Sequence, residues 1–220
     1  MTELSGDLFE WRADFFERHF DPSQIQHVLK EMKKTARKRE IIFALRSIDQ
    51  GGHCALKDDD LKHEIFQAVI DSNCADYIEL ELEPEPFSPW KKDILQQIKA
   101  SGHKAIIAAY NYENTPGAEE ITSLVRRCET TGADIPKIAV MTHDRRDILS
   151  LLQGILKLEE IYGKRDRIVV GMGREGNISR VAPWLFGSFL TFASSITTSM
   201  PGQINPNDLT LIMSHLHTER

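Results

Sequence analysis

The sequence predicts an α/β protein built as a TIM (β/α)8-type barrel, and three observations support this fold class. Short apolar segments typical of strands alternate with amphipathic segments typical of helices, at spacings of roughly 30 residues, which is the pattern of βαβ units. Charged residues lie within or at the ends of several strand segments, where a barrel gathers its functional groups. No linker, repeat or low-complexity stretch divides the chain, so we expect a single domain over residues 1–220.

The expected strands are of two kinds. Most are short apolar runs of the type that is buried on both faces of a parallel sheet. Two instead alternate charged and apolar residues, and a period of two places the charges of each on one face. They are the first strand, with Glu10, Arg12 and Asp14, and Tyr77–Leu82, with Glu79 and Glu81. In chain order the seven expected strands are Asp7–Phe16, Glu40–Arg46, Tyr77–Leu82, Lys104–Tyr110, the strand that carries Lys137 and the apolar run Ile138–Met141, Arg167–Met172 and Phe189–Ser194.

The segments between the strands carry apolar residues at helical spacing. In Asp144–Tyr162, the longest of them, Ile148, Leu151 and Leu152 fall on one stripe. A short helix is expected at the end of the loop Gly173–Arg180. In chain order the longer expected helices are Pro22–Lys38, Asp58–Asn73, Trp90–Ala100, Ala118–Glu129, Asp144–Tyr162 and Asn205–His217.

Two architectures fit this alternation: a closed barrel and an open, doubly wound sheet. The charges at strand ends favour the barrel. A full barrel has eight strands and the sequence shows seven, so we expect an incomplete barrel with at most a remnant of another strand in Met1–Gly6. A missing strand exposes two sheet edges, which proteins normally pair or cover. We therefore expect a homodimer, or a helix that fills the gap.

Composition and charge argue against several classes of protein. The net charge of -6 disfavours a general nucleic-acid or membrane-surface binder. The three cysteines form no CxxC pair, so neither a disulfide framework nor a zinc site is indicated. Acidic residues stand near the N-terminus where a signal peptide carries basic ones, and no apolar run approaches the roughly 18 residues of a membrane span. We expect a cytoplasmic protein.

Lys137 is the first candidate for chemistry. It lies inside the expected strand whose apolar run is Ile138–Met141, a pattern typical of a buried strand. A buried lysine loses hydration, which favours the neutral amine, and a neutral amine attacks ketones to form a Schiff base. The alternative interpretation is a lysine at a strand end whose ammonium group reaches water.

Three other patterns carry weaker signals. Gly171–Gly176 matches GxGxxG after a strand, but it lacks the acid expected about 20 residues on, so a glycine-permitted turn is the alternative to a nucleotide site. His215 and His217 have no third metal ligand nearby. Ser88 and Ser199 lack the GxSxG elbow of a serine hydrolase. We expect neither a cofactor nor a metal.

Eight stretches together resemble the type I 3-dehydroquinate dehydratases, the Schiff-base enzymes of the shikimate and quinate pathways. They follow the family's order over nearly the whole chain, and the lysine, ISR and PGQI stretches are specific as a set. The matching stretches are Glu10–Phe16, Ala44–Gly52, Ile78–Leu82, Thr115-Pro116, Gly132–Met141, Gly171–Arg180, Phe186–Phe192 and Pro201–Ile204.

The resemblance implies a role for each matched site residue. Lys137 would form the Schiff base with the ring ketone of 3-dehydroquinate, and Glu81 would support the catalytic pair. The residues that would hold the substrate's carboxylate and hydroxyls are Glu10, Arg12, Arg46, Arg180, Ser199 and Gln203. The alternative for Arg12 and Arg46 is a structural role as strand-end ion pairs with Glu10 and Glu81.

The chain departs from the family in two places. Tyr110 stands where the family has the histidine that acts as general base and acid. A tyrosine hydroxyl is a weaker base at neutral pH, although it can still donate a proton. The family's first strand is also missing ahead of Asp7–Phe16. The lysine is untouched by either difference.

Three functions of different classes follow. The first is a dehydratase that uses Lys137, with Tyr110 as a poorer proton carrier. The second is a noncatalytic or regulatory binder of quinate-like or shikimate-like carboxylates. The third is a nucleotide-dependent enzyme that uses Gly171–Gly176. Dehydroquinate turnover separates the first from the second, and titration with NAD and NADP tests the third.

Overall fold

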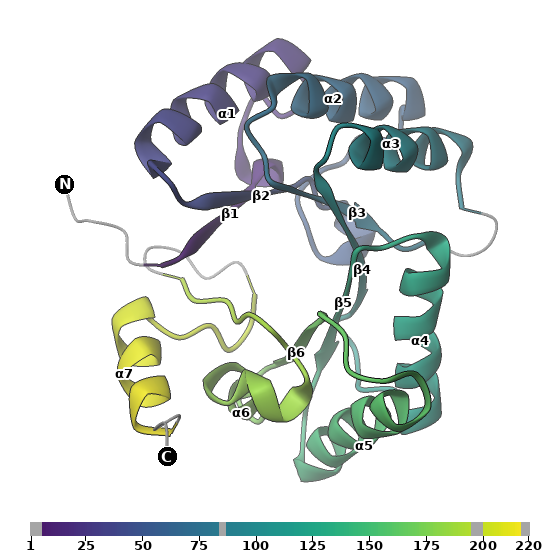
Figure 1. Cartoon of the computed structure of the whole chain (residues 1–220), viewed down its shortest axis with the longest axis vertical. Helices are drawn as coiled ribbons and strands as arrows, with labels where there is room; N and C mark the ends of the chain where they lie inside the picture. The colour runs from purple at the N-terminus through teal and green to yellow at the C-terminus, as the bar shows by residue number, and fades with distance from the viewer. Residues whose placement is uncertain (1–5, 84–86, 195–199, 217–220) are drawn as a thin grey trace. The chain divides into compact units, whose positions relative to one another are not determined.

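Six parallel strands form one sheet in a computed structural model that describes residues 6–83, 87–194 and 200–216 (Figure 1). The strands pair in the order in which they occur along the chain. An open doubly wound sheet reverses its order at a switch point, so this sequential order is that of the barrel type. The strands are β1 (Leu8–Arg12), β2 (Glu40–Ala44), β3 (Tyr77–Glu81), β4 (Lys104–Asn111), β5 (Ile135–Met141) and β6 (Ile168–Met172).

Helices connect and follow the strands, as the sequence predicts. Aspartates cap three of them: Asp21, Asp58 and Asp144 each accept backbone N–H groups of the first turn. The helices are α1 (Pro22–Ala36), α2 (Asp59–Ser72), α3 (Pro89–Ala100), α4 (Ala118–Thr131), α5 (Arg145–Tyr162), α6 (Asn177–Val181) and α7 (Pro206–Leu216). Short 3-10 turns occupy Ala13–Phe15, Ile48–Gln50 and Pro183–Phe186.

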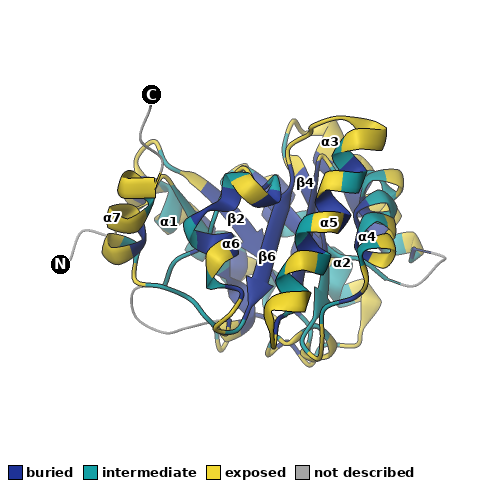
Figure 2. Cartoon of the chain, turned by 90° about the horizontal axis from the view of Figure 1, so that it is seen from below, coloured by how far each residue is buried: buried dark blue, intermediate teal, exposed yellow. Residues whose placement is uncertain are grey.

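The chain divides into two compact units. The amino-terminal unit comprises residues 7–108 and 129–135, and the carboxy-terminal unit comprises residues 109–128 and those from 136 onwards. Most strand residues are buried in Figure 2, whereas the outward helix faces are exposed.

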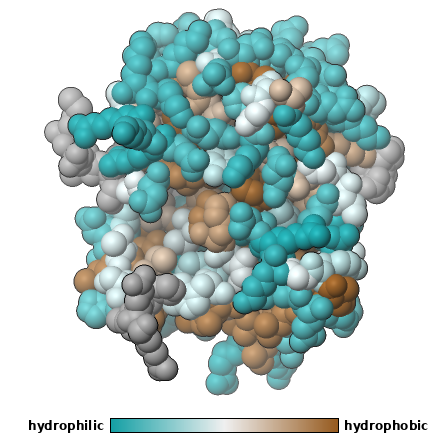
Figure 3. Space-filling model, in the orientation of Figure 1, coloured by the Kyte–Doolittle hydropathy of each residue, from teal (hydrophilic) through white to brown (hydrophobic). Residues whose placement is uncertain are grey.

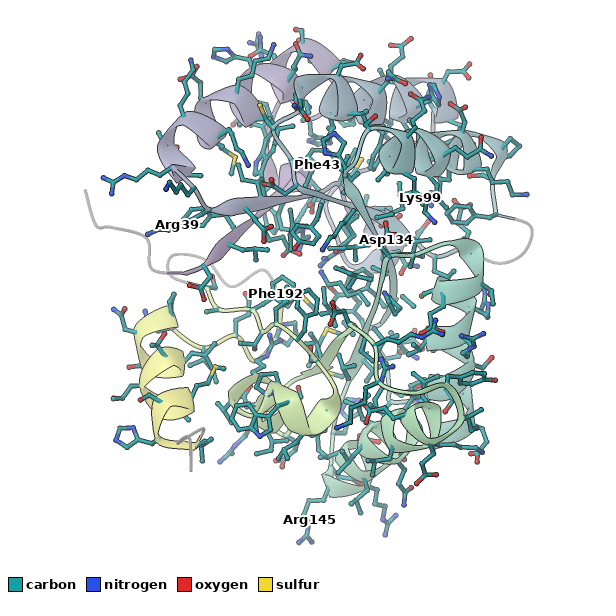
Figure 4. All side chains as sticks on the ribbon, viewed as in Figure 1. Arg39, Phe43, Lys99, Asp134, Arg145 and Phe192 are labelled. Carbon is teal, nitrogen blue, oxygen red and sulfur yellow. The ribbon has the colours of Figure 1, made fainter. Side chains whose placement is uncertain are left out.

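Two aspartates fix the amino ends of strands in the amino-terminal unit. The backbone N–H of Asp76 donates to the carbonyl of Ile41, and the Asp76 carboxylate accepts the N–H of Ile41 at 2.8 Å. Asp134, labelled in Figure 4, makes the same two bonds with Ala105, at 3.0 and 2.8 Å. Each aspartate thus makes a pair of hydrogen bonds with one residue of the preceding strand and defines where the next strand starts.

An apolar cluster forms the core of the carboxy-terminal unit. Ile138 and Val140 of β5 pack with side chains of α4 and α5, among which Ile155 is 1% exposed. Ile138 directly follows Lys137 in β5, so this core anchors the strand that carries the lysine. No helix within the described ranges is long and apolar enough to cross a membrane.

The prediction of a seventh strand at Phe189–Ser194 is wrong. These residues are irregular apart from an isolated bridge between Ala193 and Ile204. The Ser188 hydroxyl accepts the N–H of Val169 at 3.0 Å. This N–H at the edge of β6 is therefore bonded to a side chain and not to the backbone of another strand. The described residues therefore form six strands where the sequence predicts seven, so the barrel in this part of the chain is less complete than expected.

Several large apolar side chains remain exposed at the end of the carboxy-terminal unit. In α7, Leu209 is buried but Leu211 and Leu216 are 59% and 54% exposed. Figure 3 shows hydrophobic surface near α6 in the same unit.

Replacing Ile155 by alanine should destabilise the protein by about 2–5 kcal/mol, because it leaves a cavity in this core. Leu156→Ala is the matched control on the same helix, since Leu156 is 48% exposed. We expect the control to lie within about 0.5 kcal/mol of wild type. Urea unfolding of the three proteins measures the difference, and equal midpoints for the two variants would contradict the assigned core.

Candidate functional site

The strand register brings charged residues into one row of the amino-terminal unit. Arg12 lies opposite Ala44, which lies opposite Glu79, which in turn lies opposite Ile106. Arg46 lies two residues after Ala44, just beyond the end of β2, and Glu81 lies two residues after Glu79 in β3. Because the strands are parallel, these charges gather near their carboxyl ends, the edge at which barrel enzymes build their sites.

Arg12 is held by Asp14, which follows it in the first 3-10 turn. Nε and Nη2 of Arg12 donate to the two carboxylate oxygens of Asp14, each at 2.8 Å. Asp14 is 2% exposed. Burial by itself would raise the pKa of Asp14, but the hydrogen bond and positive charge of Arg12 outweigh it and lower that pKa. Asp14 is therefore ionised at neutral pH.

Arg46 pairs with Glu79 rather than with Glu81. Arg46 Nη2 lies 3.3 Å from Glu79 Oε1, and both side chains are almost completely buried. The ion pairs of the two arginines thus differ from those expected. Arg12 pairs with Asp14, and Arg46 pairs with Glu79. Buried pairs of this kind keep a guanidinium charged and oriented.

Glu81 fixes the residue that follows Arg46. Its Oε1 accepts the N–H of Ser47 at 2.7 Å and the Ser47 hydroxyl at 2.9 Å. Burial raises the pKa of Glu81 despite these bonds. Glu81 also lines a cavity of about 450 Å³ together with Trp90 and Lys91. Lys91 is paired with Glu83 at 2.7 Å, and this ion pair lowers the pKa of Glu83 although burial opposes it.

In the carboxy-terminal unit, Lys137 is buried near two aromatic rings. It is 1% exposed and pairs in register with Ile168 of β6. Its Nζ lies 4.5 Å from the ring centroid of Phe192 and 5.7 Å from that of Tyr110. The prediction that Lys137 is buried within a strand is confirmed. Tyr110 in turn stacks on Tyr112, with ring centroids 6.2 Å apart.

Arg180 is buried beside the same aromatic group. Its Nη1 donates to the carbonyl of Phe192 at 3.4 Å, and its Nη2 donates to that of Pro201 at 3.2 Å. Burial lowers the pKa of Arg180 to about 10, so the guanidinium stays charged at neutral pH. Phe192, labelled in Figure 4, therefore offers its ring to Lys137 and its carbonyl to Arg180.

The glycine pattern at Gly171–Gly176 is explained by packing. A Cβ at Gly176 would collide with the backbone of Gly171, and Gly173 has a φ of +82°. The N–H of Gly171 donates to the Ser179 hydroxyl at 2.8 Å. These contacts hold α6 against β6 and so position Arg180, which accounts for the motif as a turn.

The remaining candidates have the following places. Glu10 is half-buried in β1, opposite Ile42, and Gln203 Oε1 accepts the N–H of Met200 at 3.3 Å. Ser199 and His217 lie outside the described residues. His215 contacts the carbonyl of Leu211 at 2.7 Å, and no group of potential metal ligands occurs in the ranges that the structure describes.

Sequence reasoning did not assign Asp14, Glu79, Ser47 or Phe192 to the site. The alternation of charges in β1 and β3 was a usable signal for the two acids, because each has the same parity as a candidate residue. Ser47 and Phe192 act through a backbone N–H and a carbonyl as well as their side chains, and no residue pattern marks such contacts.

Comparisons with known proteins agree on one family. The family model for type I 3-dehydroquinase matches residues 1–220. The chain is 34% identical to a 3-dehydroquinate dehydratase from Escherichia coli, covering 98% of this chain and 84% of the relative, and 36% identical to one from Bacillus licheniformis, covering 97% and 83%.

Solved structures agree as well. The crystal structure of 3-dehydroquinate dehydratase from Geobacillus kaustophilus has a TM-score of 0.89 at 30% identity, covering 96% of this chain and 81% of that one. A type I 3-dehydroquinate dehydratase from Clostridium difficile, described with covalently modified comenic acid, has a TM-score of 0.88 at 31% identity, with coverage of 98% and 83%.

The two acids at the end of β3 should respond to pH in opposite senses. The raised pKa of Glu81 means that wild type loses stability as the pH rises from its ordinary value of 4.5 through the folded value. Glu81→Gln removes this loss, so its stability relative to wild type should increase between pH 4 and pH 7.

The lowered pKa of Glu83 has the reverse consequence, because wild type gains stability as the pH rises through the folded value towards 4.5. Glu83→Gln should therefore fall further below wild type over that range. Urea unfolding of both variants from about pH 3 to pH 7 compares the slopes. Slopes of the same sign would contradict the assigned environments.

Proposed function

Because the chain belongs to the type I 3-dehydroquinase family, a family of lyases, we propose that it dehydrates 3-dehydroquinate to 3-dehydroshikimate through a Schiff base on Lys137. The observation that carries the proposal is a buried lysine, 1% exposed, whose Nζ lies near two aromatic rings in a chain that matches the family throughout. The covalently modified ligand in the name of the Clostridium difficile relative is consistent with such chemistry.

The reaction has three stages. The neutral amine of Lys137 adds to the ring ketone, and loss of water gives an iminium ion. This ion withdraws electrons and acidifies the neighbouring carbon, whose proton passes to a base. The protonated base then gives that proton to the hydroxyl on the next carbon, which leaves as water. A second water then hydrolyses the imine and releases the unsaturated ketone and the free lysine.

The proposed substrate contacts are those that the family resemblance implies. Arg12, Arg46 and Arg180 supply guanidinium donors, which match the planar carboxylate and the hydroxyls of the substrate. Glu10, Ser199 and Gln203 complete the proposed set, and Glu81 supports it through Ser47. These substrate-binding roles stay predictions.

Tyr110 is the proposed proton carrier. Its ring, on β4, faces Lys137 Nζ, and it stands where the family pattern has a histidine. A phenol donates a proton readily but is a weak base at neutral pH. This difference favours the second candidate function, a noncatalytic or regulatory binder of quinate-like or shikimate-like carboxylates. Turnover of 3-dehydroquinate, followed by the absorbance of the enone product, decides between the two.

The biological setting also stays a prediction. We propose a cytoplasmic protein of the shikimate or quinate pathway that forms a homodimer and acts on a small molecule without a nucleic-acid or membrane partner. Analytical ultracentrifugation of the purified chain tests the oligomeric state, and a monomer at micromolar concentration would contradict the dimer.

Treating the protein with 3-dehydroquinate and borohydride should leave a stable adduct on Lys137, because borohydride reduces the imine to an amine. Peptide mass mapping locates the modified residue. Lys104→Ala, which removes an exposed lysine at the start of β4, should label as well as wild type. An adduct that persists in Lys137→Ala would overturn the assignment.

Tyr110→His should raise the dehydratase rate at least about tenfold at pH 7, the cautious end of the range for a general acid–base group. Tyr112→His is the matched control, since Tyr112 stacks on Tyr110 but has no assigned role. Any wild-type activity should increase toward alkaline pH, where a phenol becomes a better base. A wild type already as fast as Tyr110→His would mean that another residue relays the proton.

A further inference from the structure

Asp14 is a buried carboxylate that the proposed chemistry does not use. Its side chain has no exposed surface, yet it collects donors from three parts of the amino-terminal unit. Both oxygens bind Arg12, Oδ2 also accepts the N–H of His53 at 3.0 Å, and Oδ1 faces the N–H of Arg46 at 3.5 Å. Carboxylates with this many donors hold other groups in place.

The first effect of this arrangement is on the orientation of the Arg12 guanidinium. Asp14 occupies the Nε and Nη2 side of the guanidinium, and the ring of Phe15 lies 5.0 Å from Cζ. Nη1 is buried and has no hydrogen-bond partner within the described residues. Arg12 is 8% exposed, so a buried donor edge is left on the opposite side from Asp14.

The second effect is on the loop after β2. The N–H groups of Arg46 and His53, which both point to Asp14, bracket this loop. The loop is also closed on itself, because the N–H of Cys54 donates to the carbonyl of Arg46 at 3.1 Å. One carboxylate therefore ties the turn after β1 to both ends of the neighbouring loop.

We propose that Asp14 is a positioning residue for ligand binding, which locks the guanidinium of Arg12 and the 46–53 loop so that Nη1 is the donor offered to a carboxylate-bearing polyol. This inference rests on the proposed function, which places Arg12 in the substrate site. Asp14 contacts no reacting atom and acts through Arg12.

A double-mutant cycle with quinate as the probe tests this role. Isothermal titration of wild type, Asp14→Asn, Arg12→Gln and the double variant gives four affinities. We expect Asp14→Asn to weaken quinate binding about tenfold in the wild-type background and less than about twofold in the Arg12→Gln background. Asp76→Asn, which also loses a carboxylate bound to a backbone N–H and a lysine, is the control and should keep wild-type affinity.

Equal losses in both backgrounds would show a structural role that is independent of Arg12 and would overturn the proposal, as would an unchanged affinity in Asp14→Asn. Wild-type protein supplies a second readout if Asp14→Asn does not fold. The Arg12 Nε–H signal in NMR should be protected from exchange with and without quinate. Loss of that protection on quinate addition means that the pair opens, and the proposal fails.

The proposed dehydratase can fail separately. Its tests are turnover and the borohydride adduct on Lys137, whereas this cycle measures equilibrium binding only. A protein that binds quinate but forms no adduct contradicts the dehydratase and still reports the coupling between Asp14 and Arg12.

Discussion

The parallel register of the strands is the constraint on which the rest of the amino-terminal unit depends. It sets Arg12, Ala44 and Glu79 in one row, and two residues beyond that row come Asp14 and Arg46. A slip of one residue would turn every side chain of a strand to the other face. Asp76 and Asp134 oppose such slips, because each bonds both the N–H and the carbonyl of one residue on the preceding strand.

Most of the fold was predictable from the sequence, because the segments that read as apolar runs are the segments that are buried as strands. The β2 and β6 segments read as apolar runs and are almost entirely buried. Phe189–Ser194 is also rich in apolar residues, but the N–H of Val169 at the edge of β6 donates to the hydroxyl of Ser188. Periodicity reports which residues avoid water, whereas pairing depends on which edge groups are already occupied, and only the folded chain determines that.

The candidate site was predictable to a different extent. Lys137 and Arg180 were found through motifs, and their burial follows from the strand and the glycine-dependent turn beside them. Asp14 appears in the sequence as one more charge in an alternating strand. Its importance comes from a 3-10 turn that points its carboxylate back to Arg12 and across to the next loop, and such a turn leaves no periodic signal.

The arginines differ in how their buried charge is compensated, and this difference bears on their roles. Arg12 and Arg46 each face a carboxylate that offsets the cost of burial. In the described part of the chain, both hydrogen bonds of Arg180 go to carbonyl oxygens, and burial lowers its pKa to about 10. An anion that binds Arg180 would supply the missing counter-charge, whereas the same anion at Arg12 would compete with Asp14. The physical balance therefore favours Arg180 as the anchor of a substrate carboxylate, and it leaves Arg12 as a donor whose direction is already set.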